Sequence, residues 1–304
     1  MGAMPDDDDD YQRGRDSFDR LVRGDAMIGL VADVPAMERE MMDALWAAAA
    51  RGSIPAFRTL GECYLAALRP IGAFEGIDPS DADGRPWPRD VTAIDDERPS
   101  LQAALRAYAA AGRADREALQ QFAKLSRSSS PDNQRRALAM LSDLPQPSGE
   151  ELYLRGLVQH WLGELAHSHA THVEAAAAGN ADAMFELYVL YTQGLGVEAD
   201  GTAAQQWLER AAGADHPRAL YNLGAAIASA STGPADMAKA ASYYERAAQR
   251  GNARAAATLG VMILQQEIEG TTDDAIRWLD TADEGGYPSW EMLEAADLDD
   301  PREG

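Results

Sequence analysis

Histidines are the residues whose type and spacing could most directly do chemistry in this chain. Four of the five are His160, His167, His169 and His172. The last two are three residues apart, so they could share one face of a helix and bind a metal ion. No cysteine or aspartate nearby completes a ligand set, however, and Ser168–Thr171 is predicted to be a loop that enters a helix. We therefore expect ordinary exposed histidines and no metal.

One acidic motif is weakly similar to a calcium-binding loop. It consists of Asp81-x-Asp83-Gly84 followed by Asp90. Pro79 takes the place of the first ligand, and proline offers no side-chain oxygen to a hard cation. The motif therefore does not predict a calcium site.

The motifs of common catalytic sites are absent from the sequence. It contains no Gly-x-Ser-x-Gly nucleophile elbow and no His-Glu-x-x-His zinc motif. The pair Gly194-x-Gly196 follows a predicted helix rather than a strand, so it does not indicate a phosphate-binding loop. We therefore expect a protein that is not an enzyme and that holds no cofactor.

A fixed spacing of turn residues organises the second half of the sequence. Gly179, Asp215, Gly251 and Gly286 are separated by 36, 36 and 35 residues. A constant period of this size is typical of one supersecondary unit that stacks on copies of itself. Apolar residues at steps of three and four follow each turn and predict a first helix, and a second helix precedes the next turn. The sequence therefore predicts an all-α protein built from helix pairs.

Large and small residues alternate where the predicted helices must meet. An aromatic residue of each second helix precedes a small pair by four residues: Trp207 precedes Ala211-Ala212, Tyr243 precedes Ala247-Ala248, and Trp278 precedes Ala282-Asp283. Residues at this spacing share a face, so we expect them to form the core. In the first helices, Gly224 and Gly260 predict that another helix approaches closely.

The longest motif reads Tyr191-x-x-Gly194-x-Gly196-Val197-x-x-Asp200-x-x-x-Ala204-x-x-Trp207-x-x-x-Ala211-Ala212. It resembles the Sel-like repeat, a relative of the tetratricopeptide repeat. The resemblance covers residues 179–290, extends partly over 147–178 and has an echo at Trp46–Tyr64. Tyr188, at a position where other copies have glycine, and the loop Ser229–Asp236, which lacks Gly-x-Gly-Val, depart from it. The resemblance implies a right-handed α/α superhelical solenoid of antiparallel helix pairs that serves as an adaptor or scaffold.

Composition limits the partners of the chain. A net charge of -23 over 304 residues makes nucleic acid an unfavourable partner. The acidity either keeps the large surface of a solenoid soluble or indicates a basic protein partner. The single cysteine, Cys63, excludes an intramolecular disulfide, and we expect it to be buried as a small hydrophobe. No apolar run is long enough for a membrane span or a signal peptide. We therefore expect a cytoplasmic protein that does not bind membranes.

The sequence divides into segments of different composition. Helices are predicted over Asp16–Leu30, Ala36–Arg51, Leu101–Ala111, Arg113–Leu125, Pro131–Leu144 and Trp290–Leu298. The expected domains are a disordered acidic tail (1–15), N-terminal helices with one degenerate repeat (16–76), a Pro- and Asp-rich insertion whose Trp87 docks on the solenoid (77–100), degenerate helical pairs (101–149), the Sel-like repeat solenoid (150–298), and a second tail (299–304).

The related tetratricopeptide repeats bind ligands along a concave face that is lined by each first helix. The groove residues that the resemblance implies are Asp182, Phe185, Glu186 and Val189, then Arg218, Tyr221, Asn222 and Ala225, then Arg254, Ala257, Thr258 and Val261. Arg218 and Arg254 place positive charge in an acidic protein, and arginine and aromatic residues commonly anchor interfaces. The alternative is that both arginines pair with neighbouring carboxylates such as Glu186.

Three functions are compatible with these observations. The first is a non-enzymatic scaffold that binds a peptide or protein partner in the groove. The second is an immunity-type or inhibitory protein that masks a basic toxin or enzyme. The third, a hydrolase, is implied by cysteine-rich relatives that have been credited with cleaving cell-wall-like compounds, but this chain lacks their paired cysteines.

Overall fold

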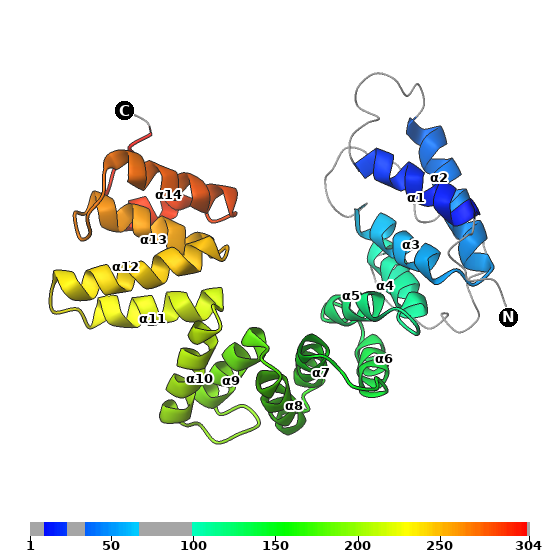
Figure 1. Cartoon of the computed structure of the whole chain (residues 1–304), viewed down its shortest axis with the longest axis horizontal. Coiled ribbons are helices and arrows are strands. Elements are labelled where there is room, and N and C mark those ends of the chain that lie inside the picture. Colours follow the sequence, from blue (N-terminus) through cyan, green and yellow to red (C-terminus); the bar gives the residue numbers. More distant parts are fainter. Residues whose placement is uncertain (1–8, 23–33, 67–98, 303–304) are drawn as a thin grey trace. The chain divides into compact units, whose positions relative to one another are not determined.

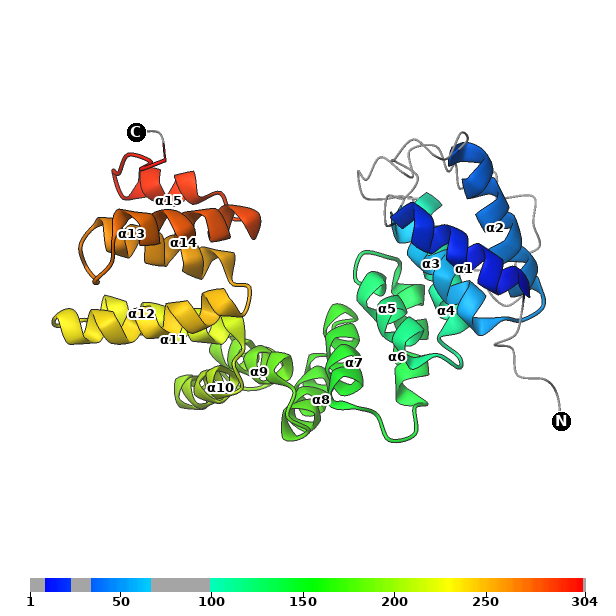
Figure 2. The same ribbon diagram turned by 45° about the horizontal axis from the view of Figure 1, so that its top comes forward.

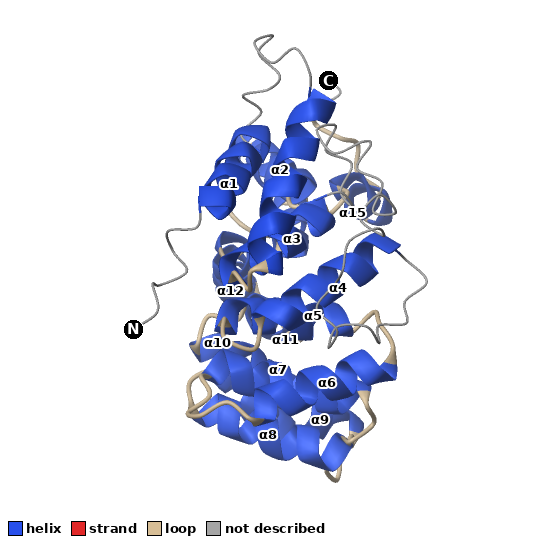
Figure 3. Cartoon of the chain, turned by 90° about the vertical axis from the view of Figure 1, so that its right-hand side faces the viewer, coloured by secondary structure: helices blue, strands red, loops and turns tan. Residues whose placement is uncertain are grey.

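The computed structural model describes residues 9–22, 34–66 and 99–302. These residues form fifteen helices and no strand, which confirms the all-α prediction (Figures 1 and 3). The helices are α1 (Asp9–Val22), α2 (Val34–Ala50), α3 (Ile54–Ala66), α4 (Pro99–Ala111), α5 (Arg116–Ser126), α6 (Pro131–Ser142), α7 (Gly149–Trp161), α8 (Leu165–Ala177), α9 (Ala181–Gln193), α10 (Gly201–Gly213), α11 (Pro217–Ser229), α12 (Pro234–Gln249), α13 (Ala253–Leu264), α14 (Thr272–Glu284) and α15 (Ser289–Ala295).

The chain divides into two compact units, and helix α7 contributes to both. The first unit comprises Met1–Pro147 and Leu154–Glu164, and the second comprises Ser148–Tyr153 and Leu165–Gly304. Within each unit, helices pack chiefly against their neighbours in the sequence. This arrangement confirms the predicted helix pairs, whereas the handedness of the stack stays a prediction.

The echo of the repeat in the first unit is a true helix pair. Helices α2 and α3 meet at Gly52, whose φ of 90° lies in the left-handed region that glycine adopts without strain. Ala48 and Ala49 are buried before the turn, and Cys63 is buried after it, as predicted. Burial, followed by the neighbouring Glu62 carboxylate, raises the pKa of the Cys63 thiol far above its usual range. Cys63 is therefore an unreactive core residue.

The predicted disordered tail is wrong in its second half, because α1 begins at Asp9. Two ion pairs hold this helix: Asp10 binds Arg51 at 2.6 Å, and Arg15 binds Glu62 at 2.6 Å. Phe18 is buried on the same helix. Residues distant in the sequence thus stabilise the start of α1, although its acidic composition alone predicts disorder. Most of the insertion at 77–100, with Trp87, lies outside the described residues.

The second unit contains the repeats, and its turns take the predicted form. Gly179, Gly251 and Gly286 have φ values of 87°, 86° and 79°, and Asp215 has 58°. Aspartate is strained there, but its carboxylate binds Arg246 of α12 at 2.6 Å and Arg250, the residue after α12, at 2.7 Å. The hydrogen bond from Arg246 is the main reason that the pKa of Asp215 is lowered. Asp215 thus ties one repeat to the next.

The predicted close contacts between the helices of each pair are confirmed. A Cβ atom at Gly224 would lie 2.9 Å from the ring of Tyr244, and one at Gly260 would lie 2.9 Å from Leu279. Larger residues at these glycines would therefore separate the helices. The alanine pairs of the second helices are buried, as predicted, with Ala211 and Ala247 fully inaccessible, as are Ala240, Ala255 and Ala282.

The loop predicted at Ser168–Thr171 is wrong, because these residues lie inside α8. Ser168, Thr171 and His172 are buried in the second unit rather than exposed. The His172 ring lies 5.8 Å from that of Tyr153. Small polar side chains on the inner face of this helix disguised its periodicity in the sequence.

Helix α15 closes the C-terminal end, as the predicted capping helix does, and lies beside α13 and α14 (Figure 2). The tail that follows is anchored to α14. The guanidinium of Arg302 binds Asp283 at 2.7 Å, Asp280 at 3.1 Å and Asp300 at 2.6 Å. The last described residues thus extend the repeat unit rather than leave it.

Candidate functional site

The predicted groove residues lie on the first helices α9, α11 and α13. Arg218 is exposed in the first turn of α11, and Arg254 is exposed at the equivalent position of α13. Tyr221 and Asn222 are half-buried one turn further along α11. The repeat therefore places Arg218 and Arg254 at equivalent positions of successive first helices, as the sequence predicted.

Both arginines stack on an aromatic ring of the preceding first helix. The guanidinium carbon of Arg218 lies 4.6 Å from the centre of the Phe185 ring, and that of Arg254 lies 5.2 Å from the centre of the Tyr221 ring. A cation over an aromatic face is attracted by the ring quadrupole, and the contact restricts the side chain. The same pair thus recurs at the same repeat position.

The sequence left open that Arg218 and Arg254 pair with neighbouring carboxylates, and the structure does not show such pairs among the residues it describes. Within the described parts of the chain, the ion pairs do not include Arg218 or Arg254. A guanidinium carries five N–H donors in a fixed fork, and stacking on a ring uses none of them. Both side chains can therefore offer their donors to a carboxylate from a partner.

Phe185 is not a contact residue for a partner, contrary to the prediction. It is 3% exposed, because the His216 ring stacks on it with centroids 4.5 Å apart and an interplanar angle of 16°. The centroid of the Tyr188 ring lies 5.5 Å from that of Phe185. Phe185 is therefore the support on which Arg218 rests.

His216 also fixes the start of α11. Its Nδ1 accepts a hydrogen bond from the backbone N–H of Ala219 at 3.2 Å, so in the neutral ring the proton is on Nε2. That Nε2 lies 3.4 Å from the carboxylate of Asp182. Asn180 and Asn252 cap the equivalent helices through side-chain oxygens. Histidine thus replaces the usual cap and adds a contact to the preceding repeat.

In the third set of predicted groove residues, Arg254 is exposed and Thr258 is half-buried beside α15, whereas Val261 is buried, which corrects the prediction for Val261. Val261 is 8% exposed and packs with Leu279 and Leu293. The Thr258 hydroxyl donates to the carbonyl of Arg254 at 2.9 Å and lies 3.7 Å from Met292 of α15. Ala257 is fully buried as well. The transferred register could not show that α15 packs beside this helix.

Tyr153 belongs to this surface, although the sequence analysis missed it. It lies on α7 at the position that corresponds to Phe185 and Tyr221, and it is half-buried. Burial and then the carboxylates of Asp182 and Glu186 raise the pKa of its hydroxyl above the usual range, while Arg218 opposes them. The repeat at 148–180 is shorter than the others, so the fixed spacing did not reach Tyr153. The Ser148–Glu151 capping box marks that start.

We call the resulting surface the first-helix face. Its members are Tyr153, Asp182, Glu186, Val189, Arg218, Tyr221, Asn222 and Arg254, all exposed or half-buried. The carboxylates come from α9, whereas the arginines come from α11 and α13. The face therefore carries negative charge on α9 and positive charge on α11 and α13. Its concave curvature stays a prediction.

The described residues contain neither a cluster suited to a metal ion nor a helix suited to span a membrane. No group of three histidine, cysteine, aspartate or glutamate residues is placed there to hold a metal ion. His169 instead lies with its ring 5.3 Å from that of Tyr191, edge to face, and burial lowers the pKa of its imidazole. Of the helices in these residues, none combines the length and apolar character needed to cross a bilayer.

Two solved structures are similar to this chain at low sequence identity. The chain is 23% identical to the Sel1 repeat protein from Oxalobacter formigenes, with a TM-score of 0.47 over 62% of this chain and 84% of that one. It is 16% identical to c5321, a protective antigen present in uropathogenic Escherichia coli strains displaying an SLR fold, with a TM-score of 0.35 over 92% of this chain and 62% of that one. A search of the curated proteins found no match.

The family match is independent of these structures. The Sel1 repeat model matches residues 181–216 and 217–252, which are the units α9–α10 and α11–α12 with the turns that follow them. The predicted resemblance is thereby confirmed for these units. Residues 181–252 thus match two consecutive Sel1 repeats, and over these two units the chain is similar to the Sel-like repeat family.

Proposed function

We propose that this protein is a non-enzymatic scaffold that binds a protein partner through the first-helix face. The Sel1 repeat fold commonly mediates protein–protein interaction. The observation that carries the proposal is the repeated arginine–aromatic stack, Arg218 on Phe185 and Arg254 on Tyr221. A partner segment with a carboxylate at each arginine would fit it.

The stacks favour binding because they reduce its entropic cost. A free arginine side chain loses roughly 0.5–1.5 kcal/mol of rotamer freedom when an interface immobilises it. Arg218 and Arg254 are already restricted by their rings, while their donors remain available. A charge-assisted, forked hydrogen bond to a carboxylate can then contribute nearly its full strength.

The proposal can be tested with peptides selected on the full-length protein. A displayed peptide library is selected on the wild-type chain, and each enriched peptide is synthesised and its affinity is measured by calorimetry. We expect carboxylate-containing peptides, and we expect Arg218→Ala to weaken their binding by about 1–3 kcal/mol, which is roughly five- to 150-fold. Circular dichroism checks that the variant is folded.

Arg210→Ala is the matched control. Arg210 also stacks on an aromatic ring, with its guanidinium carbon 3.9 Å from the centre of the Trp207 ring, but both residues lie on the second helix α10. This variant loses the same charge outside the first-helix face, so binding should be retained. If Arg218→Ala and Arg210→Ala bind the selected peptides equally well, the first-helix face is not the binding site.

A further inference from the structure

The loop that joins the two helices of a repeat can pack against the second helix of the preceding repeat. In the repeat of α9 and α10, this loop contains Gly196, whose φ is 71°. A Cβ atom at Gly196 would lie 2.2 Å from the carbonyl oxygen of Leu165 at the start of α8. Only glycine permits this contact, so the loop lies directly on the backbone of α8.

The corresponding loop after α13 cannot close in the same way. Gln266 takes the left-handed position, with φ of 60°, that Gly194 takes with 68° two repeats earlier. The residue that corresponds to Gly196 is Ile268, and a side chain at this position cannot make the backbone contact that Gly196 makes. A pocket of about 1130 Å³ lies between this loop, α12, α13 and α14.

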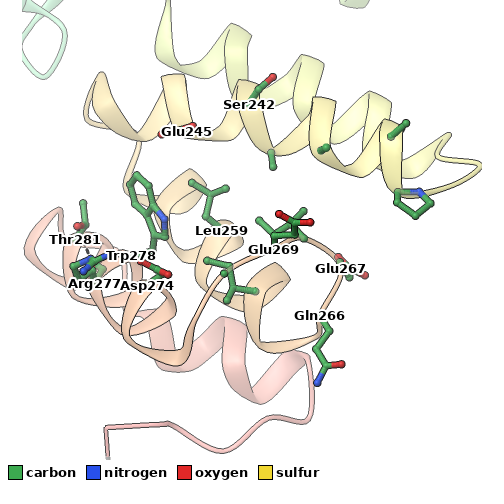
Figure 4. A pocket seen from close by; sticks show the side chains of 17 residues that line it. Ser242, Glu245, Leu259, Gln266, Glu267, Glu269, Asp274, Arg277, Trp278 and Thr281 are labelled. Carbon is green, nitrogen blue, oxygen red and sulfur yellow. Dashed lines mark hydrogen bonds and ion pairs between the residues drawn. The ribbon is translucent and has the colours of Figure 1, made fainter.

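The floor of this pocket is apolar. Leu259 and Trp278 point into the space that separates α13 and α14 from α12 (Figure 4). Ile263 and Ile268 complete the floor, and small residues of α12, among them Ala238, line the opposite side. An aliphatic or aromatic side chain of a ligand would find apolar contacts on several sides, which is typical of an anchor pocket.

The rim of the pocket is acidic. Four carboxylates line it, Glu245 from α12, Glu267 and Glu269 from the loop, and Asp274 from α14. Arg277 is the single basic residue of the lining, and it is bound to Asp274. Glu245, Glu267 and Glu269 are exposed, so the charge that a ligand meets around the apolar floor is negative.

We propose that this pocket, between α12, α14 and the loop 265–271, binds a basic amphipathic segment of a partner protein. An apolar side chain of the segment enters against Leu259 and Trp278, and flanking lysine or arginine residues meet Glu245, Glu267 and Glu269. Charge complementarity selects this occupant over acidic or neutral segments. The pocket shares no residue with the first-helix face. It is therefore a second site, and its test does not depend on the first.

A designed peptide probes the pocket directly in the full-length protein. The probe has leucine and tryptophan at helical i, i+4 spacing between lysine residues, and its neutral analogue has glutamine in place of each lysine. Binding is measured by fluorescence anisotropy of labelled peptide, and the indole N–H signal of Trp278, assigned with Trp278→Phe, reports contact in NMR spectra. We expect the lysine probe to bind, to shift this signal, and to bind at least about tenfold more tightly than the neutral analogue.

Two matched pairs of variants test the floor and the rim. Ala238→Trp fills the pocket from the exposed side of α12, and Thr202→Trp makes the same change one repeat earlier, outside it. Glu245→Lys reverses a rim charge, and Glu209→Lys reverses the charge at the corresponding position of α10. We expect only the pocket variants to lose at least about tenfold in affinity.

The proposal is overturned by any of three results. The lysine probe could leave the Trp278 signal unchanged, Ala238→Trp could bind as tightly as Thr202→Trp, or the neutral analogue could bind as well as the lysine probe. A self-association in sedimentation experiments that Ala238→Trp abolishes, together with absent probe binding, would assign the pocket to a second copy of the chain instead. Binding of the probe by Arg218→Ala at wild-type affinity would show that the two sites are separate.

Discussion

Replacement of Gly196 by alanine should open a closed inter-helix loop of the repeats. The glycine has φ of 71°, and its missing Cβ would lie 2.2 Å from the carbonyl oxygen of Leu165. Gly194 provides a matched control in the same loop. Its φ is 68°, but its Cβ would make only ordinary contacts of 3.4 Å with Ala199. The two substitutions therefore differ in the steric clash and hardly at all in backbone strain.

The expected magnitudes follow from these two geometries. The left-handed conformation costs an alanine roughly 1–2 kcal/mol, and this cost applies to both variants. The lower entropy of the unfolded chain returns about 0.4–1 kcal/mol to both. A clash with a backbone oxygen adds about 1–3 kcal/mol at Gly196 alone, because the loop must move away from α8. Gly196→Ala should therefore be less stable than Gly194→Ala by about 1–3 kcal/mol.

Urea unfolding followed by circular dichroism measures both free energies of unfolding. Amide hydrogen exchange at the start of α8 locates the change, since a displaced loop exposes the backbone there. Equal free energies for the two alanine variants would refute the reasoning. They would mean that the loop does not rest on α8.

Two further predictions concern the core and the C-terminal anchor. Ala247→Leu should destabilise the protein by about 1–3 kcal/mol, because Ala247 is fully buried. Ala226→Leu changes an exposed position and should not destabilise it, and thermal unfolding compares the two variants. Burial raises the pKa of Asp283, but hydrogen bonds from the Ser289 backbone and the Arg302 guanidinium outweigh it, so the net pKa is lowered. The resulting stability is present above the ordinary aspartate pKa of about 3.9 and is lost as the pH falls through the lower folded value. Asp283→Asn should therefore be less stable than wild type at pH 6 and lose less on acidification to about pH 2, as measured by thermal midpoints; parallel curves would contradict this assignment.

The backbone of the second unit could be predicted from sequence because its signals are local and repeated. The spacing of Gly179, Asp215, Gly251 and Gly286 fixed the helix pairs, and all four residues adopt the left-handed conformation. Small residues at helix contacts were equally informative. A glycine inside a helix is costly unless another side chain occupies its space, as Tyr244 does at Gly224.

The chemistry of the candidate surface could be predicted only in part, because register shows which residues share a face but not what covers them. Arg218 and Arg254 lie where the repeat placed them, whereas Phe185 is covered by His216, and Val261 is covered by α15. These covers come from residues that do not follow the repeat. The histidine cap His216 and the short final helix α15 have no periodic signature in the sequence. Which residues they cover can be seen only in the packed structure.

Departures from the repeat are therefore the places where this chain differs chemically from a uniform solenoid. His216 replaces an asparagine cap, and in doing so it supports Phe185 and through it Arg218. Ile268 stands where an earlier repeat has a loop glycine, and the acidic pocket lies beside this loop. In both cases the substituted residue lies at a helix cap or in a loop rather than inside a helix. Binding specificity can thus change from one repeat to the next at little cost to the fold, which is why the two proposed sites use different residues of equivalent repeats.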